Sequence, residues 1–266
     1  MTPARPDPGH YELKQLRSSV IAIRLSHRGR FRMARRLVEP FAGRTLLDYG
    51  CGDGAFLSVV SDLFPAAVGT DFNSGQIADC RRRFDGVLPT VSFRDVAELR
   101  APEFAHRFGV VTCMEVLEHC VAADVDVVLD KLSRLVAPDG IAIVSVPIEI
   151  GPSLIVKQAL RVWAGWRRIG DYQYAERYRI SELLTMVLAT RRARIARPVY
   201  SAGPSDGWRY HGHKGFNWRA LRDRIGENFT VQETRFSPLG SPAGLLDSQA
   251  WFICRPRDGR RSAASR

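Results

Sequence analysis

A repeated alternation of apolar runs and amphipathic segments constrains the fold of this chain more than any other feature of its sequence. Residues 44–63 read RTLLDYGCGDGAFLSVVSDL, which is an apolar run, a glycine loop, and then apolar residues at the spacing of one helix face. Five such alternations follow one another within about one hundred residues, up to Pro147. This pattern predicts an α/β fold with a doubly wound, mostly parallel, Rossmann-like sheet and helices on both faces.

The remainder of the chain extends this domain and adds an insertion. Residues 148–215, after the fifth predicted strand, lose the alternation and contain basic, Trp-bearing helices and a loop rich in Gly, Pro and Ser. A helix in FNWRALRDRIGENF and strands in TVQETRF and QAWFICR then bring the predicted sheet to seven strands. We therefore expect one domain over residues 43–255, with a helical and loop insertion at 148–215 on its substrate side.

Two terminal segments lie outside this predicted domain. Residues 1–42 predict an N-terminal helical cap, formed by two helices that are broken near Gly29. Residues 256–266 form a basic tail, and we expect this tail to be disordered.

The charge of the chain points to an anionic partner without choosing one. Lys and Arg number 39 and Asp and Glu number 28, which leaves a net charge of +11. Nucleic acid, an anionic membrane surface and a phosphorylated substrate all fit this charge, and so does a solvated basic surface without a partner.

The sequence predicts a cytoplasmic protein. The N-terminal run VIAI is too short for the apolar region of a signal peptide, and no segment approaches the roughly 18 apolar residues of a membrane span. The five cysteines are odd in number and include no C-x-x-C pair, which argues against a disulfide framework and against a structural zinc site.

The loop DYGCGDG, residues 48–54, indicates a nucleoside-containing cofactor. Glycines at alternate positions let the backbone turn tightly after the first strand and let a ligand lie against it. Asp71 follows 71 − 48 = 23 positions later at the end of the second predicted strand, where it can accept hydrogen bonds from both hydroxyls of a ribose. The loop is neither the G-x-G-x-x-G of nicotinamide enzymes nor a G-K-[ST] phosphate loop.

These motifs, in this order, resemble those of the class I methyltransferases that use S-adenosylmethionine, and the resemblance covers roughly residues 44–147. It implies that 43–255 is a methyltransferase domain. It also implies that the cofactor is bound by residues of the glycine loop, by one acid that contacts the ribose and another that contacts the adenine, by two residues that stack on the adenine ring, and by one residue after the fourth strand. These residues are Asp48, Gly50, Gly52, Gly54, Asp71, Asp95, Phe72, Val96 and Met114. The alternative is that Asp48 and Asp71 only cap loops.

The segment MEVLEHC, residues 114–120, follows the fourth strand, where ligands of this fold bind. Glu115, Glu118 and His119 would share one face if a helix began here. Three interpretations stay open. One of these side chains is a general base for a substrate hydroxyl, the three hold a divalent cation, or the acids merely start a helix.

A second histidine segment bears on this choice. EVLEH, and less closely HKGFNW at residues 213–218, resemble segments of the 3′-terminal small-RNA 2′-O-methyltransferases, although HKGFNW has an extra glycine and Asn217 in place of an acid. MEVLEH also resembles the ubiquinone-pathway O-methyltransferases. The resemblance implies that Glu115, Glu118, His119 and His213 are catalytic residues and ligands of a divalent metal. Such a set suits manganese, iron or zinc better than magnesium.

Residues 151–180 suggest how the acceptor is reached. They combine apolar and basic side chains in an amphipathic pattern that predicts contact with anionic lipid, or else a lid helix whose tryptophans pack on the domain. The residues concerned are Leu154, Ile155, Leu160, Trp163 and Trp166, with Lys157, Arg161, Arg167 and Arg168.

The expected function is S-adenosylmethionine-dependent O-methylation of a small or lipid-linked hydroxylated acceptor, by a cytoplasmic enzyme that can contact a membrane peripherally. The alternatives are an RNA 2′-O-methyltransferase, although the chain has no recognisable RNA-binding module, and a non-catalytic binding protein that keeps a cofactor-like fold.

Overall fold

The computed structural model describes residues 21–167, 176–202 and 208–257 of the chain. The predictions for residues 1–20, for Arg168 and for the tail beyond residue 257 lie outside these ranges. The chain forms two compact units. The first contains the described parts of residues 1–114, 130–144 and 253–266, and the second contains the described parts of residues 115–129 and 145–252.

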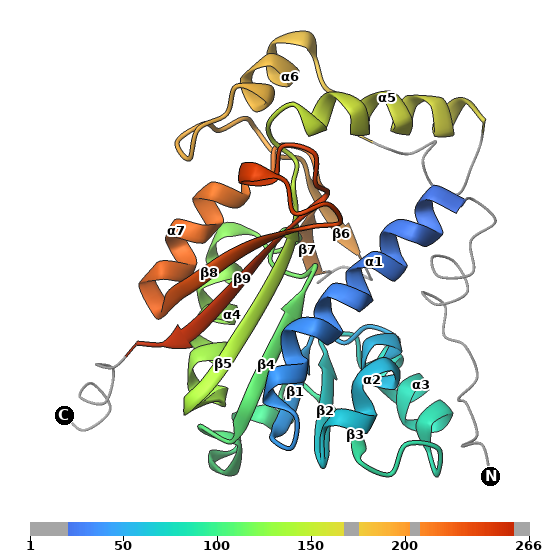
Figure 1. Ribbon diagram of the computed structural model, residues 1–266, viewed down its shortest axis with the longest axis vertical. Coiled ribbons are helices and arrows are strands. Elements are labelled where there is room, and N and C mark those ends of the chain that lie inside the picture. The colour runs from blue at the N-terminus through green and yellow to red at the C-terminus, as the bar shows by residue number, and fades with distance from the viewer. Residues whose placement is uncertain (1–20, 168–175, 203–207, 258–266) are drawn as a thin grey trace. The chain divides into compact units, whose positions relative to one another are not determined.

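The predicted seven-stranded, mostly parallel sheet is confirmed, with the strand order β3-β2-β1-β4-β5-β9-β8. Its strands are β1 Thr45–Tyr49, β2 Ala66–Asp71, β3 Val91–Asp95, β4 Phe108–Met114, β5 Val136–Pro147, β8 Phe229–Ser237 and β9 Gln249–Pro256. Within the first unit, β1 pairs in parallel with both β2 and β4, and β2 pairs in parallel with β3 (Figure 1). The carboxyl ends of these strands therefore lie at one edge, which is where ligands bind in this fold.

Three α-helices accompany these strands in the first unit, namely α1 Ile21–Val38, α2 Ala55–Val60 and α3 Ser74–Phe84. Helix α1 lies against α2, and the ring of Phe31 is 6.1 Å from that of Phe56 (Figure 1). The predicted break near Gly29 is wrong, because α1 runs through this residue. A helical glycine costs only about 1 kcal/mol, and burial of Ala34, Leu37 and Val38 in the same helix offsets that cost.

Strand β5 begins earlier than the sequence predicts. The prediction placed a turn at APDG, before a strand at IAIVSVP, whereas the structure begins β5 at Val136. Val136 is fully buried, and its carbonyl oxygen lies 3.1 Å from Nδ1 of His106. This contact with a residue 30 positions away is not visible in a local pattern.

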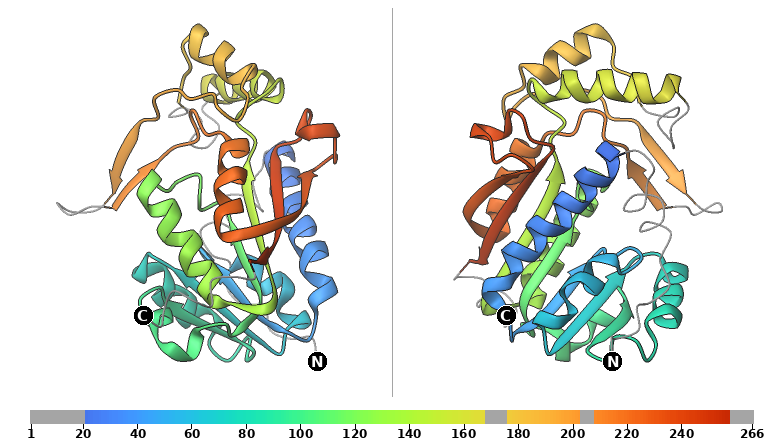
Figure 2. Two further views of the ribbon diagram at one scale, coloured as in Figure 1. Left: turned by 90° about the vertical axis from the view of Figure 1, so that its left-hand side faces the viewer. Right: turned by 45° about the vertical axis from the view of Figure 1, so that its right-hand side comes forward.

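Helix α4, Ala122–Leu135, begins in the second unit and ends in the first. The second unit also contains α5 Ser153–Trp166, α6 Ile180–Val187 and α7 Trp218–Asn228. Helices α5 and α6 contact each other (Figure 2). Short 3-10 turns occupy Glu39–Phe41, Ser61–Leu63, Glu98–Arg100, Pro102–Phe104 and Pro242–Gly244.

An antiparallel two-stranded ribbon in the insertion escaped the sequence analysis. Strand β6, Val199–Ala202, pairs with β7, Trp208–His211 (Figure 2). Each strand has four residues, too few for a clear alternation. Aromatic rings stabilise the pair, since the ring centre of Tyr210 lies 4.9 Å from that of Trp208 and 5.6 Å from that of Tyr200. The ribbon ends at the segment that carries His211 and His213.

Candidate active site

The glycine loop of the first unit is shaped by backbone hydrogen bonds to β2. The amides of Gly50 and Cys51 both donate to the carbonyl oxygen of Thr70, at 2.8 and 2.9 Å. Gly54 has a φ of +76°, and a Cβ at this position would lie 2.8 Å from Cε2 of Phe84. The loop therefore requires glycine here, for its left-handed backbone and for space.

Asp71 ties this loop to the end of β2. Its carboxylate accepts hydrogen bonds from the amide of Gly52 at 3.1 Å and from that of Asn73 at 2.9 Å. The side chain is buried, and burial raises its pKa although these amides act in the opposite direction.

Asp48 is the most perturbed acid of this unit. It is 2% exposed and accepts a hydrogen bond from the hydroxyl of Thr112 at 2.8 Å. Burial raises its pKa to about 7, the Thr112 hydroxyl opposes this, and the charge of Asp71 adds to it. Asp48 is therefore only partly ionised near neutral pH and would gain from a cationic ligand.

The remaining predicted cofactor residues follow β2, β3 and β4. Phe72 is 58% exposed. Asp95 lies beside Asp71 in the sheet register and is 3.3 Å from Nη2 of Arg81. Val96 and Met114 are half-buried. All nine predicted residues thus lie at or just after the carboxyl ends of the first four strands, within the first unit.

The segment that begins the second unit is not helical. Glu115 has a φ of +57°, and its amide donates to the carbonyl oxygen of Ser145 at 2.9 Å. The amide of His119 closes a turn on Val116, and α4 begins only at Ala122. The expectation that Glu115, Glu118 and His119 share a helix face is therefore wrong, and so is the helix-start interpretation.

The two histidine segments lie side by side, although His119 and His213 are 213 − 119 = 94 residues apart. The amide of His211 donates to the carbonyl oxygen of His119 at 2.9 Å, and Cys120 forms a β-bridge with Tyr210. The imidazole rings of His119 and His213 are 5.1 Å apart and nearly perpendicular. The structure thus brings together histidines that the sequence linked only by resemblance.

The hydrogen bonds of His119 define its tautomer. Nδ1 lies 2.8 Å from the carbonyl oxygen of His211, and a carbonyl only accepts, so Nδ1 carries a proton. In the neutral ring Nε2 is then an acceptor, and it lies 3.8 Å from Oε1 of Glu118, a fully buried carboxylate. A backbone carbonyl thus holds Nδ1, while Glu118 lies on the side of Nε2, where its negative charge would stabilise an imidazolium.

His213 has a different electrostatic role. Burial lowers its pKa to about 4, and the nearby charge of Glu149 only partly opposes this. The ring is therefore neutral at physiological pH, and its Nδ1 has no hydrogen-bond partner within the described residues.

The predicted metal ligands are only partly assembled. Glu118, His119 and His213 are neighbours, whereas Oε1 of Glu115 lies 3.4 Å from the hydroxyl of Ser145. Across the described ranges, no three or more His, Cys, Asp or Glu side chains are arranged to hold a metal ion. These side chains do not form a metal site as they stand.

Sequence reasoning missed Glu149, a fully buried acid just beyond β5. Arg161 donates two hydrogen bonds to its carboxylate, at 2.7 and 2.8 Å, and Lys157 lies 3.3 Å away. Burial would raise the pKa of Glu149, but the two cations hold it at about 2. The i, i+4 spacing of Lys157 and Arg161 was a visible signal. The prediction turned both residues toward lipid, whereas they face inward.

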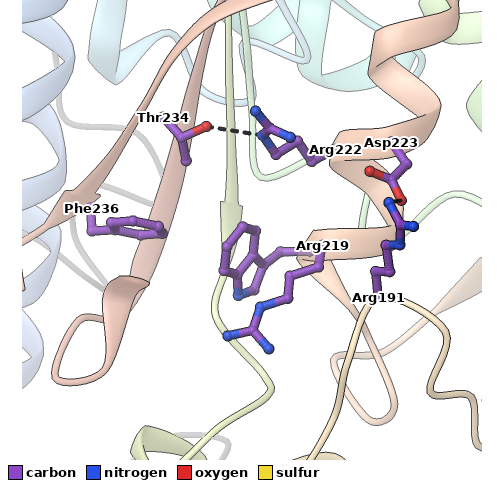
Figure 3. A pocket seen from close by; sticks show the side chains of 7 residues that line it. Arg191, Arg219, Arg222, Asp223, Thr234 and Phe236 are labelled. Carbon is purple, nitrogen blue, oxygen red and sulfur yellow. Dashed lines mark hydrogen bonds and ion pairs between the residues drawn. The ribbon is translucent and has the colours of Figure 1, made fainter. Parts of the chain in front are cut away.

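A groove between α7 and β8 contains none of the predicted residues. Its volume is about 390 Å³, and it is lined by Arg191, Trp218, Arg219, Arg222, Asp223, Thr234 and Phe236 (Figure 3). Arg222 donates to the hydroxyl of Thr234 at 3.2 Å, and the guanidinium of Arg219 stacks over Trp218. Through these contacts, Arg219 and Arg222 take part in the packing of α7 on β8.

The parallel sheet, the glycine loop after β1 and the acid that ends β2 define a class I methyltransferase that depends on S-adenosylmethionine. Residues 26–186 match the model of a methyltransferase domain, and the chain belongs to this family.

The chain is similar to proteins named ubiquinone biosynthesis O-methyltransferase. The protein from Rhizobium rhizogenes is 28% identical over 194 residues, which cover 71% of this chain and 76% of the relative. The protein from Azorhizobium caulinodans is 33% identical over 110 residues, which cover 41% of this chain and only 43% of the relative. The match thus spans about half of the latter's length.

Solved structures share the fold at low sequence identity. The PH0226 protein from Pyrococcus horikoshii superposes with a TM-score of 0.59 at 13% identity, over 94% of this chain and all of that one. The N-methyltransferase NodS from Bradyrhizobium japonicum, in complex with S-adenosylhomocysteine, has a TM-score of 0.52 at 13% identity, over 87% of each chain. The small RNA methyltransferase HEN1 has a TM-score of 0.55 at 15% identity, over 87% of this chain and 25% of that one.

Proposed function

We propose that this protein transfers the methyl group of S-adenosylmethionine to an oxygen of a small or lipid-linked hydroxylated acceptor, with His119 as the general base. The observation that carries the proposal is the held imidazole: Nδ1 is fixed on the carbonyl of His211, and Nε2 stays available next to Glu118. The relatives named ubiquinone biosynthesis O-methyltransferase support an oxygen acceptor.

The cofactor, when bound, supplies an electrophilic methyl group on a positively charged sulfur. We assign its amino-acid end to Asp48 and the loop of Gly50, Gly52 and Gly54, and its ribose to Asp71. The adenine would lie between Phe72 and Val96 with Asp95 at its amino group, and Met114 would complete the contacts. Apart from the exposed Phe72, these residues are buried or half-buried at or just after the carboxyl ends of parallel strands, which supports this assignment.

Nε2 of His119 would take the proton of the acceptor hydroxyl as that oxygen accepts the methyl group that the bound cofactor would supply. The products are a methyl ether, the demethylated cofactor and an imidazolium. Glu118 stabilises that positive charge across 3.8 Å in a buried environment, as the carboxylate does in other acid–imidazole pairs. Alignment of the reacting atoms at about 3 Å supplies much of the remaining rate enhancement.

A divalent cation on Glu115, Glu118, His119 and His213 is the competing proposal. The neutral ring of His213 favours it, and so does the Nδ1–H of His119 on a carbonyl, since metal-bound histidines often donate in this way. The absence of a converging donor set within the described residues weighs against it.

Turnover with labelled S-adenosylmethionine and a panel of catechols, hydroxybenzoates and RNA oligonucleotides separates these proposals. General base catalysis predicts loss of activity in His119→Ala, activity near that of the wild type in His213→Ala, and no effect of exhaustive chelation. A metal predicts that chelation and His213→Ala both abolish turnover and that added Mn²⁺ or Zn²⁺ restores the chelated enzyme. Methylation of RNA alone would replace the small acceptor with a 2′-hydroxyl.

We also propose that α5 and α6 rest on an anionic membrane from which a lipid-linked acceptor is taken. None of the described helices is long and apolar enough to span a membrane. Both helices nevertheless carry exposed apolar side chains, including Trp166 at 77% and Ile180 at 81% exposure. Arg167 stacks over Trp163 and Trp166, which places a cation beside rings that favour the lipid headgroup region.

A further inference from the structure

We infer that Arg197 is a positioning residue, which joins the Glu118–His119 segment to the His211–His213 segment and thereby holds the catalytic imidazole in its working tautomer. The catalytic consequence of this inference rests on the proposed function. The structural part, the link between Arg197 and the state of the His119 ring, can be measured independently of any reaction.

Arg197 lies between α6 and β6, outside every motif that the sequence analysis selected. Its Nη2 donates to the carbonyl oxygen of Glu118 at 2.5 Å and to that of Gly212 at 3.0 Å. Its Nε lies 3.3 Å from the carbonyl oxygen of Lys214. One guanidinium thus binds backbone on both sides of the pairing between His119 and His211.

The surroundings of Arg197 make these bonds strong. The guanidinium stacks on the ring of Phe216 at 5.4 Å. Burial lowers the pKa of Arg197, while the charges of Glu118 and Glu176 oppose that effect, so the group stays cationic. Hydrogen bonds from a desolvated cation are stronger than those between neutral groups. A lysine has no planar fork and could not reproduce this geometry.

Glu176 and Tyr178 also hold the histidine segment, without contact to Glu118. Glu176 accepts a hydrogen bond from the amide of Lys214 at 2.7 Å, and the hydroxyl of Tyr178 accepts one from the amide of Gly215 at 2.9 Å. A Cβ at Gly212 would lie 2.5 Å from Oε2 of Glu176, so a larger residue here would displace the carboxylate that holds the amide of Lys214. These contacts hold residues 211–216 but do not reach Glu118.

Loss of the Arg197 bridge should therefore loosen the pairing of His119 with His211. The Nδ1–H of His119 would lose its carbonyl acceptor for part of the time, and the ring would shift to the Nε2–H tautomer that imidazole favours in water. Nε2 would then carry a proton itself, so it could not take the proton from the hydroxyl of the substrate. The expected kinetic effect is a fall in kcat of about 10- to 100-fold, by analogy with the loss of groups that orient metal-binding histidines.

The test uses the full chain with ¹⁵N-labelled histidine in four forms: wild type, Arg197→Lys, Arg197→Gln and Arg194→Lys. Arg194 is a matched control, because it is exposed and bonds only carbonyls of its own loop, those of Arg191 and Ala193. The imidazole nitrogen shifts report the tautomer. Calorimetry with S-adenosylhomocysteine reports whether the cofactor site is intact, and kcat and KM are measured with the best acceptor.

The inference predicts Nδ1–H at His119 in the wild type and in Arg194→Lys, and a shift toward Nε2–H in both Arg197 variants with unchanged cofactor affinity. It is overturned if His119 keeps the same tautomer in Arg197→Lys. Circular dichroism checks that this variant is folded, so its nitrogen shifts alone decide the matter should Arg197→Gln not fold. A wild-type enzyme without turnover on any acceptor refutes the proposed function, whereas the nitrogen shifts still decide the role of Arg197.

Discussion

The affinity for S-adenosylmethionine should rise steeply with pH around neutrality because of Asp48. This carboxyl is 2% exposed, and burial raises its pKa to about 7. The cofactor brings an ammonium and a sulfonium, and we assign its amino-acid end to Asp48. A cationic ligand binds the carboxylate form, so protonation of Asp48 competes with binding.

The size of the effect follows from the ionised fraction. With a pKa of about 7, about one Asp48 in eleven is ionised at about pH 6 and about three in four at about pH 7.5. If only the carboxylate binds, the apparent association constant rises by about eightfold over this range, or about 1.2 kcal/mol. The range stops at about pH 7.5, because an α-amino group itself titrates near 7.7 to 8.0.

Titration calorimetry across this range checks the prediction, and repetition in buffers of different ionisation enthalpy counts the proton released on binding. Asp48→Asn should bind weakly, with little dependence on pH. Thr112→Val removes the hydroxyl that lowers the pKa of Asp48, so it should move the midpoint to higher pH. An affinity that stays constant over the range, or a pH dependence that persists in Asp48→Asn, would refute the reasoning.

The same carboxyl affects stability without the cofactor. Its folded pKa lies above the unfolded value near 3.9, so the folded state binds more protons between the two values. The stability that this group contributes is fully present below about pH 3.9 and is lost as pH rises through about 7. The melting temperature of the wild type should therefore fall more over this range than the melting temperature of Asp48→Asn.

Three further substitutions test other parts of the molecule. Asp71→Ala should abolish measurable cofactor binding in a folded protein, because each charge-assisted hydrogen bond to the ribose is worth about 1.5–3 kcal/mol, and unchanged affinity in calorimetry would contradict the assignment. Joint replacement of Trp163 and Trp166 by Ala should greatly reduce flotation with anionic vesicles, whereas Leu239→Ala, 69% exposed but outside α5 and α6, should not. Glu149→Gln leaves two cations without their shared buried carboxylate and should cost about 3–5 kcal/mol in chemical denaturation, and a loss below about 1 kcal/mol would show that the charges are not coupled.

The sheet and the cofactor edge could be predicted because both follow from local order. Alternating apolar runs fix the strands, and the carboxyl ends of parallel strands meet at one edge. Asp48 and Asp71 could be placed at this edge from the glycine loop and the ends of the first two strands. Asp95 was placed there by resemblance to the family.

The second unit shows where local patterns fail. The left-handed backbone of Glu115 accompanies a hydrogen bond to Ser145, thirty residues on, which no helical spacing reveals. The inward direction of Lys157 and Arg161 depends on Glu149, a buried acid whose partners lie on a helix with an apolar outer face. Charged residues on one face of a helix usually point to solvent, whereas Lys157 and Arg161 point to the protein interior. Arg197 escaped notice because it bonds only backbone carbonyls, which leave no sequence pattern.

The boundary between the two units falls between Met114 and Glu115, two consecutive residues. Every side chain assigned to the cofactor precedes this peptide bond, and every side chain assigned to proton transfer follows it. Under the proposed assignment, substitutions that change the acceptor can therefore accumulate in residues 115–129 and 145–252 while residues 48–114, which contain the methyl-donor site, stay constant. A library confined to residues 115–129 and 145–252 would vary the chemistry of the acceptor on an unchanged donor platform.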